Sequence, residues 1–188
     1  MEVNNNTTIQ SYALVQRWSD KQTDCHVHVQ CRWDQNSFVF VFDVDESVHC
    51  FRLEHDHDGA ECWEDSCVEV FLRSGFDPTC YFNFECNAGG YLLAEVGSGR
   101  VGRRRFDAGA YRQIHRHAEI LSQTAERIHW HVEISIPFDM IGVRHPADLY
   151  GNLYKCASRA DWVHYLSAFE ISSPQPDFHR PDAFRRIF

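Results

Sequence analysis

The sequence contains no apolar run approaching the roughly 20 residues that a membrane-spanning helix requires. Its first eight residues, MEVNNNTT, carry neither a basic start nor an apolar stretch, so no secretory signal is predicted. We therefore expect no membrane partner. The expected location is the cytoplasm, or the outside of the cell if a leader has been removed from the chain.

The sequence also has no excess of positively charged residues. The 18 Lys and Arg residues are outnumbered by 27 Asp and Glu residues, and the formal net charge is −9. Binding to a phosphate backbone depends on clustered cations. The one basic cluster, residues 100–105, is followed by acidic and apolar residues and is typical of a solvated loop. Nucleic acid is therefore excluded as an expected partner.

The eight cysteines contain no Cys-x-x-Cys pair of the kind that zinc sites use. They lie at positions 25, 31, 50, 62, 67, 80, 86 and 156, and this scatter defines no disulfide pairing. Several fall on strand-like positions beside aromatic residues. We expect buried free thiols that act as small hydrophobic side chains, which favours a reducing compartment.

Long amphipathic helices, internal repeats and low-complexity segments are absent too. A chain of 188 residues is most simply one domain, residues 1–188, with residues 1–8 expected to be loose. Short apolar or alternating segments separated by turns about every 8–12 residues indicate an all-β fold. We predict a two-sheet antiparallel β-sandwich, jelly-roll-like, with a long C-terminal loop over one sheet.

The expected strands are residues 25–33, 38–44, 50–54, 66–72, 81–87, 91–96, 128–136, 149–156 and 164–169. Residues 9–17 are either an edge strand or a helical turn. Residues 97–110 are expected to be a Gly- and Arg-rich loop, and residues 138–141 a single helical turn.

One stretch, residues 62–72, combines an indole with a carboxylate in the middle of an alternating strand. Glu69 is expected on the face opposite to Val68 and Val70. Carboxylates are depleted in strands and are costly to desolvate without a partner. Two ordinary explanations stay open: Glu69 lies on a solvated face or pairs with an arginine, and Trp63 fills the core.

A polar patch forms if the strands 66–72 and 81–87 are neighbours. Glu69, Asn83, Glu85 and Asn87 then share one face, with Trp63 at its lip. Carboxylates and amides suit the adjacent hydroxyls of a sugar, and an indole suits the apolar face of a pyranose. The patch has two alternative interpretations. It is the solvent-exposed face of an ordinary antiparallel sheet, or it is the active site of a glycosidase that uses Glu69 and Glu85 as an acid/base pair.

Histidine pairs with one intervening residue raise the possibility of a metal site, since such pairs share a face of a strand. They are His26/His28, His55/His57, His115/His117 and His129/His131. Each is more simply a surface or capping residue. Loop oxygens of Asp56, Asp58 or Asp65 could hold Ca²⁺, and a haem ligand other than histidine would have to be Met140.

Five stretches are fairly specific in their joint order and spacing. They are Trp63–Leu72, Tyr81–Asn87 with Gly89 and Gly90, Gly151–Cys156, His164–Ser167 and Pro176–Phe184. Together they resemble the family 9-like carbohydrate-binding domains over about residues 10–188, and most of all the stand-alone bacterial branch of that family.

The resemblance implies a non-catalytic β-sandwich that binds a mono- or oligosaccharide and takes part in the utilisation of polysaccharides such as xylan. In the xylanase-attached members the sugar at the reducing end lies between two aromatic rings and is read by carboxylate, amide and cationic groups. Trp63 matches the first ring and Glu69 the carboxylate. In place of a second tryptophan, the C-terminal loop offers Phe178 and His179.

We therefore predict that Trp63 is the stacking platform and that Glu69, Asn83 and Glu85 read the hydroxyls. The residues expected to close the site are Lys155, Trp162, Phe178 and His179. No cofactor is expected, although some relatives hold a structural Ca²⁺. A sandwich that has lost its ligand, or a metal-binding protein, is the remaining alternative.

Overall fold

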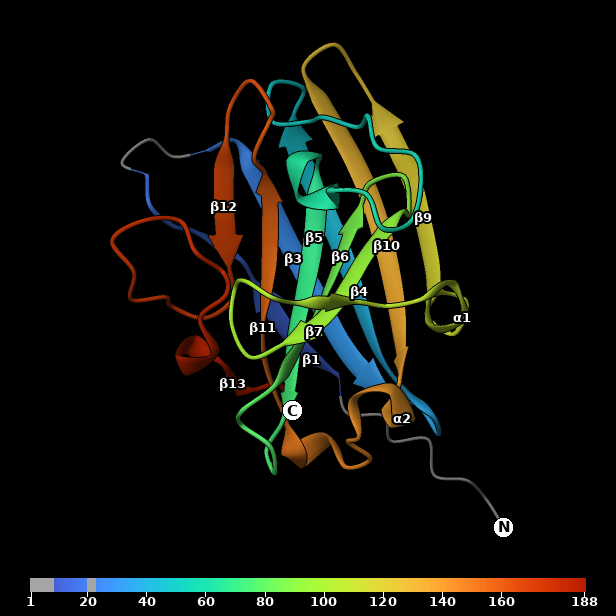
Figure 1. Ribbon diagram of the computed structural model, residues 1–188. Helices are drawn as coiled ribbons and strands as arrows, with labels where there is room; N and C mark the ends of the chain where they lie inside the picture. Colours follow the sequence, from blue (N-terminus) through green and yellow to red (C-terminus); the bar gives the residue numbers. More distant parts are fainter. Residues whose placement is uncertain (1–8, 20–22) are drawn as a thin grey trace.

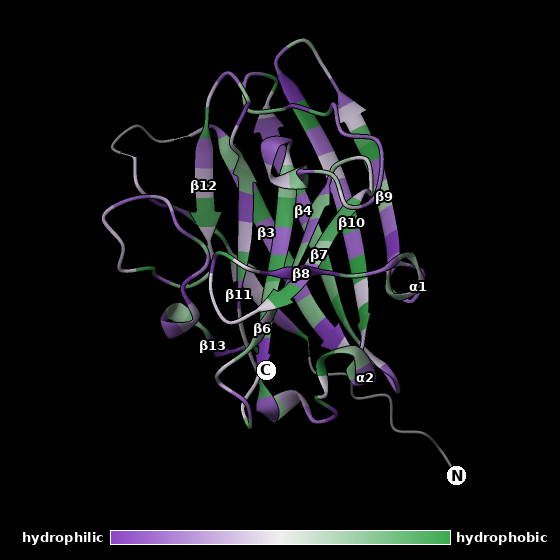
Figure 2. Cartoon of the chain, in the orientation of Figure 1, coloured by the Kyte–Doolittle hydropathy of each residue, from purple (hydrophilic) through white to green (hydrophobic). Residues whose placement is uncertain are grey.

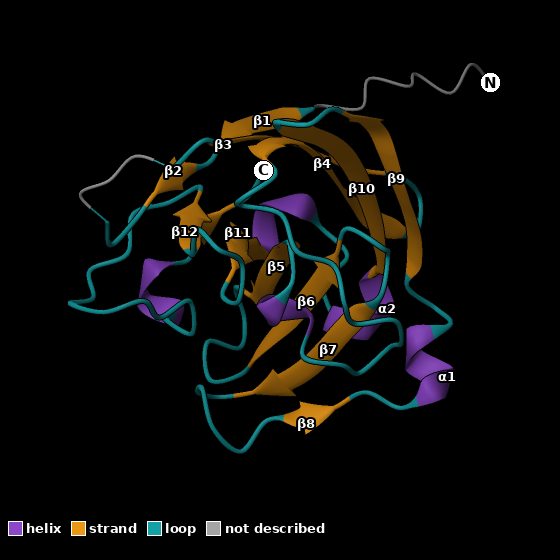
Figure 3. Cartoon of the chain, turned by 90° about the horizontal axis from the view of Figure 1, so that it is seen from above, coloured by secondary structure: helices purple, strands orange, loops and turns teal. Residues whose placement is uncertain are grey.

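Two antiparallel β-sheets packed face to face make up the protein, as a computed structural model shows for residues 9–19 and 23–188 (Figure 1). The first sheet has the strand order β1 (Gln10–Ala13), β3 (Cys25–Trp33), β4 (Ser37–Ser47), β10 (Arg127–Pro137) and β9 (His115–Gln123). Viewed from above, this sheet arches over the second (Figure 3). The predicted two-sheet sandwich is confirmed, whereas the prediction for residues 1–8 lies outside the described residues.

The second sheet carries the candidate site. Its order is β2 (Val15–Gln16), β12 (His164–Ser167), β11 (Leu149–Ala157), β5 (Cys67–Ser74), β6 (Tyr81–Asn87), β7 (Leu92–Gly97) and β8 (Arg104–Arg105), and β13 (Arg185–Arg186) also pairs with β11. The strands β5 and β6 are therefore neighbours at its centre, as the polar patch requires.

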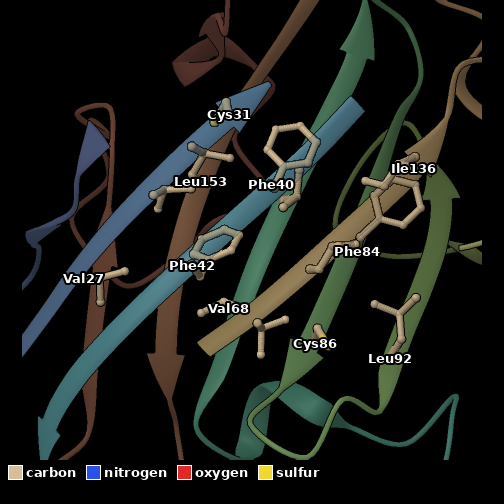
Figure 4. Close-up of a cluster of buried hydrophobic side chains, with 14 of the residues drawn as sticks. Val27, Cys31, Phe40, Phe42, Val68, Phe84, Cys86, Leu92, Ile136 and Leu153 are labelled. Carbon is tan, nitrogen blue, oxygen red and sulfur yellow. The ribbon is translucent and has the colours of Figure 1, made fainter. Parts of the chain in front are cut away.

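Alternation of apolar and polar residues shows as green and purple bands along several strands (Figure 2), and the buried apolar members form a core between the sheets. In β10, Ile128, Trp130 and Val132 are buried while His129 and His131 are half-buried, as predicted. The strand β4 lies between β3 and β10 and is buried along most of its length. Side chains from both sheets meet in this core, including Phe40 of β4 and Phe84 of β6 (Figure 4).

Helical segments are short. They are η1 (Cys62–Glu64), α1 (Ala108–Tyr111), α2 (Phe138–Ile141), η2 (Pro146–Asp148) and η3 (Pro181–Ala183). The helical turn expected at residues 138–141 is thus confirmed. Among the residues described here, no helix has the length and apolar character needed to span a bilayer.

The strand predicted at residues 50–54 is wrong. This segment is irregular because its backbone bonds to the two residues that precede β5, Asp65 and Ser66, and not to a strand ladder. The amide of Ser66 donates to the carbonyl of Arg52 (2.7 Å), and the Asp65 carboxylate accepts from the amides of Glu54 (3.1 Å) and His55 (2.9 Å).

Three strands were not predicted, and one of them, β13, lies in the C-terminal segment expected to be a long loop and pairs with β11. The edge strand β9 is mostly exposed, so its sequence does not alternate clearly between apolar and polar residues. The two-residue strand β8 lies inside the segment expected to be a loop and pairs with β7.

The cysteines are as expected: all eight are free, and seven of them are buried, with Cys80 half-buried. The outer face of the second sheet has an apolar cluster of its own, where Phe71 and Tyr154 pack against Phe178 and Phe184 of the C-terminal segment. That face is therefore partly covered, and the candidate site lies on it.

Candidate functional site

A row of side chains crosses the outer face of the second sheet and forms the floor of the site. In the strand register, Glu69 of β5 lies opposite Tyr154 of β11 on one side and opposite Glu85 of β6 on the other, and Glu85 lies opposite Leu93 of β7. Directly opposed residues of an antiparallel pair have Cβ atoms about 4.5–5.5 Å apart. The two glutamates are therefore immediate neighbours.

A cavity of about 310 Å³ opens above this row, within the range of small-molecule sites, about 300–1,000 Å³. Glu69, Glu85 and Leu93 line its floor. One wall comes from the segment 100–105, and another from residues 176–179 of the C-terminal loop. The predicted polar patch therefore lies at the bottom of a concave site, which is formed by three separated parts of the chain.

Trp63 lies at the rim of the cavity, at the centre of η1. Its side chain is 36% exposed, and its Nε1 donates a 2.7 Å hydrogen bond to Oε2 of Glu61. The other oxygen of Glu61 accepts from Arg105 Nη2 (2.7 Å), which also bonds through Nε to Glu95 (3.1 Å). The indole is therefore held in place while part of its surface faces solvent, and it does not fill the core.

Glu85 is held by a chain of polar contacts. Asn83 Nδ2 donates to Glu85 Oε1 (2.7 Å), and Arg103 Nε donates to Asn83 Oδ1 (2.8 Å). Arg103 is fixed in turn by the carbonyls of Tyr81 (2.9 Å) and Gly99 (2.8 Å). Asn83 thus orients Glu85, and Arg103 orients Asn83. The second oxygen of Glu85, Oε2, is buried and has no hydrogen-bond partner among the described residues.

Glu69 has no guanidinium partner among the described residues. Its Oε1 accepts a hydrogen bond from the Cys156 thiol (3.0 Å), and its side chain is only 2% exposed. Burial raises the pKa of Glu69 well above its ordinary value, and the neighbouring Cys156 adds to the rise. Burial also raises the pKa of Glu85, with the charge of Glu69 as the second cause. The pair therefore holds a proton more readily than two exposed carboxylates would.

The C-terminal loop docks through one stacked pair of rings. Phe178 lies parallel to Tyr154, with centroids 4.1 Å apart and an interplanar angle of 11°, and its carbonyl accepts from the Tyr154 hydroxyl (3.1 Å). The next residue, His179, shares a 2.8 Å hydrogen bond between its Nδ1 and the Tyr81 hydroxyl. Burial lowers the pKa of His179 to about 4, so it presents a neutral ring to the cavity near neutral pH.

Five of the eight predicted site residues line the cavity: Trp63, Glu69, Glu85, Phe178 and His179. A sixth, Asn83, is fully buried outside the lining and holds Glu85 through its amide, so it does not face the cavity as a hydroxyl reader. The other two require correction. Lys155 is fully buried and points between the sheets, in phase with Leu149 and Leu153 along β11. That alternation is visible in the sequence. Trp162 is 51% exposed and packs on His49, with centroids 4.6 Å apart, away from the cavity lining.

Several lining residues were not predicted, chiefly Arg100, Arg103, Arg105, Cys156 and Tyr165. The three arginines belong to the basic cluster that resembled a solvated loop. Arg103 is instead almost completely buried, with its guanidinium 4.1 Å from the centroid of the Tyr81 ring. Only the folded chain brings this cluster to the site.

Metal binding by the spaced histidine pairs gains no support. Within the described ranges, the one group that brings three ligand atoms within 4.8 Å of one another is Cys25, Glu46 and His164, which includes no member of those pairs. His129 Nε2 lies 3.0 Å from a carboxylate oxygen of Asp43, and His55 Nε2 lies 3.2 Å from a carboxylate oxygen of Glu64, so both rings already take part in hydrogen bonds.

A family model for carbohydrate-binding family 9 matches residues 2–188. The chain belongs to carbohydrate-binding family 9. The resemblance of the sequence motifs to this family is thereby confirmed. No curated protein matches the chain.

Solved structures agree with membership of carbohydrate-binding family 9. A candidate carbohydrate-binding protein from Bacteroides uniformis is 26% identical, with a TM-score of 0.80, over 96% of this chain and 85% of the other. A family 9 module from Caldicellulosiruptor kristjanssonii in complex with glucose is 13% identical, with a TM-score of 0.59, over 98% and 86% of the two chains. The same organism's family 9 module in complex with cellotriose is 12% identical, with a TM-score of 0.55, over 88% and 75%. The last two show a shared fold.

Proposed function

We propose that the cavity binds one sugar ring, either a free monosaccharide or the end of an oligosaccharide, with the ring stacked on Trp63. The observation that carries the proposal is the combination of a fixed, half-exposed indole at the rim with two adjacent carboxylates on the floor. A pyranose has an apolar C–H face and a polar edge, and this cavity offers a surface for each.

Hydroxyl recognition falls to the floor residues. An ionised carboxylate accepts hydrogen bonds only, whereas a protonated one also donates. Because the pKa values of Glu69 and Glu85 are both raised, the pair can offer a donor and acceptors side by side. Adjacent hydroxyls of a sugar need that combination. The structures of family 9 modules with glucose and with cellotriose support the choice of ligand class.

Titration calorimetry with glucose, xylose and cellotriose tests this proposal. We expect saturable binding of at least one sugar by the unaltered protein, and loss of that binding in Trp63→Ala. Trp162→Ala is the matched control, because it also removes a half-exposed indole but from outside the cavity. Equal affinities of Trp63→Ala and the unaltered protein, or no binding of any sugar, would contradict the proposal.

The same glutamate pair favours a second candidate function. A retaining glycosidase uses two carboxyl groups about 5–5.5 Å apart, one of them with a raised pKa. Directly opposed residues on β5 and β6 are compatible with that spacing. Release of reducing sugar from a panel of glycans, abolished in Glu85→Gln, would support the enzyme. Binding of an intact oligosaccharide without product would support the binding module.

A further inference from the structure

We propose that the floor of this cavity selects an amino sugar, whose ammonium group binds between the carboxylates of Glu69 and Glu85. The inference rests on the proposed sugar-binding function and specifies its ligand class. It follows from the distribution of charge around the cavity, where the cations at the rim are already neutralised and the anions on the floor are not.

Each of the three arginines that line the cavity has an acidic partner near the rim. Arg100 lies 3.0 Å from Asp177, and Arg105 lies 2.7 Å from Glu61. Arg103 lies 3.7 Å from Glu95, which also accepts from Arg105. The charges of the three arginines are therefore neutralised by three acidic residues, Asp177, Glu61 and Glu95.

The floor has no such balance. Neither Glu69 nor Glu85 forms an ion pair with any described residue. Glu69 receives the Cys156 thiol, a weak donor, and Glu85 receives one amide hydrogen from Asn83. Within the part of the chain that the structure describes, Glu85 Oε2 has no partner, and the Glu85 side chain lines the cavity while being only 3% exposed. An unpaired buried carboxylate oxygen is costly, so its retention here is consistent with a ligand that completes it.

Glu69 and Glu85 lack a cationic partner within the described chain and have few hydrogen-bond donors, and an ammonium group supplies both better than a hydroxyl does. It carries a positive charge and three donors, enough to reach both carboxylates at once. Hydrogen bonds between ionised partners are roughly twice as strong as neutral ones. An N-acetylated sugar would lose the charge and bring an added methyl group against the floor.

Proton linkage supplies a second readout. The titratable and charged groups around the pair come from three strands and the wall: Glu95 of β7, Tyr154, Lys155 and Cys156 of β11, Tyr165 of β12, and Arg100 and Arg103 of the wall. In the free protein, burial and mutual repulsion favour a shared proton on the two glutamates. A bound ammonium reverses the sign of the local field and lowers both pKa values, so binding of an amino sugar should release a proton. A neutral sugar brings no charge to the pair, so its binding should release no proton.

The experiment compares glucosamine, galactosamine and mannosamine with the matching neutral hexoses and with N-acetylglucosamine, by calorimetry on the whole chain. Measurements at about pH 6.5 lie below the ordinary range of an α-amino group, so the amines are protonated. We expect the best amino hexose to bind at least about tenfold more tightly than its neutral counterpart, a difference of about 1.4 kcal/mol. Titrations in buffers of different ionisation enthalpy should show proton release with the amine alone.

Two variants test the assignment to the glutamates. Glu85→Gln should abolish the preference for the amine, measured as the ratio of amino-hexose to neutral-hexose affinity in the same variant, whereas the exposed-surface control Glu170→Gln should leave that ratio unchanged. Equal or tighter binding of every neutral hexose would overturn the amino-sugar inference and leave the sugar-binding proposal standing. Absence of binding by all sugars, amino and neutral, would overturn both.

Discussion

The ammonium of Lys155 lies 3.0 Å from a carboxylate oxygen of Glu46, with both side chains completely buried between the two sheets. Lys155 Nζ is also 2.8 Å from His164 Nε2. The other oxygen of Glu46 accepts from Trp130 Nε1 (2.8 Å) and from the Ser66 hydroxyl (2.9 Å). Burial, with the charge of Lys155 as the second cause, lowers the pKa of His164 to about 3, so its neutral ring can accept from the ammonium. This network joins β4 and β10 of one sheet to β11 and β12 of the other and to Ser66, the residue just before β5.

Removal of one partner of this ion pair should be strongly destabilising. Lys155→Met leaves the Glu46 carboxylate buried without its cation, and we expect the free energy of unfolding to fall by about 3–5 kcal/mol. Urea denaturation followed by fluorescence measures the change. The double variant Lys155→Met with Glu46→Leu should recover part of the loss, because neither charge then remains. If Lys155→Met were as stable as the unaltered protein, the ion pair would not be excluded from solvent as the structure indicates.

Glu85 should reduce stability at high pH. Its pKa is raised in the folded chain by burial and then by the charge of Glu69. The unfolded chain therefore releases the Glu85 proton first, and this contribution to stability is complete below the ordinary pKa of 4.5 and is lost as the pH rises through the folded value.

Glu85→Gln removes that titration. We expect its melting temperature to match that of the unaltered protein at about pH 4 and to exceed it increasingly toward about pH 8. Glu170→Gln, an exposed substitution, should show no such divergence. A difference that is constant over the whole range would indicate that Glu85 is not the group responsible.

The C-terminal loop should depend on Phe178. Phe178→Ala removes the ring stacked on Tyr154, and we expect a loss of about 3 kcal/mol in unfolding free energy together with weaker sugar binding. Thermal denaturation and calorimetry measure the two effects. Phe76→Ala, which deletes an 80% exposed ring in the turn between β5 and β6, is the control and should change neither. Unchanged sugar affinity in Phe178→Ala would show that the loop is not part of the site.

Arg105 should matter for affinity more than for stability. Its ion pairs with Glu61 and Glu95 are partly exposed, and such pairs contribute about 1 kcal/mol or less. Glu61, however, holds the Trp63 indole.

We therefore expect Arg105→Met to keep its melting temperature and to lose about three- to tenfold in sugar affinity, because the ring is no longer preorganised. Arg144→Met, which removes an exposed ion pair to Asp139, serves as the control. A variant with full affinity would show that Trp63 needs no support from this side.

Most of the site could be predicted because its floor is local. The alternation of β5 and β6 places Glu69, Asn83 and Glu85 on one face, and the short connection between the strands makes them neighbours. Lys155 could have been assigned to the core from its phase with Leu149 and Leu153. The strand expected at residues 50–54 failed for a different reason, since its backbone bonds to Asp65 and Ser66, which are distant in sequence.

From the sequence alone come the sandwich, the membership of carbohydrate-binding family 9, and the shared face of Glu69, Asn83 and Glu85 on β5 and β6, because a period of two residues is set by the backbone of the strand itself. The tertiary structure alone decides that residues 100–105 and 176–179 fold over this face, that the arginines are neutralised at the rim, and that the two floor glutamates are not. Those facts depend on contacts between segments far apart in the chain, and no local pattern of side chains encodes them.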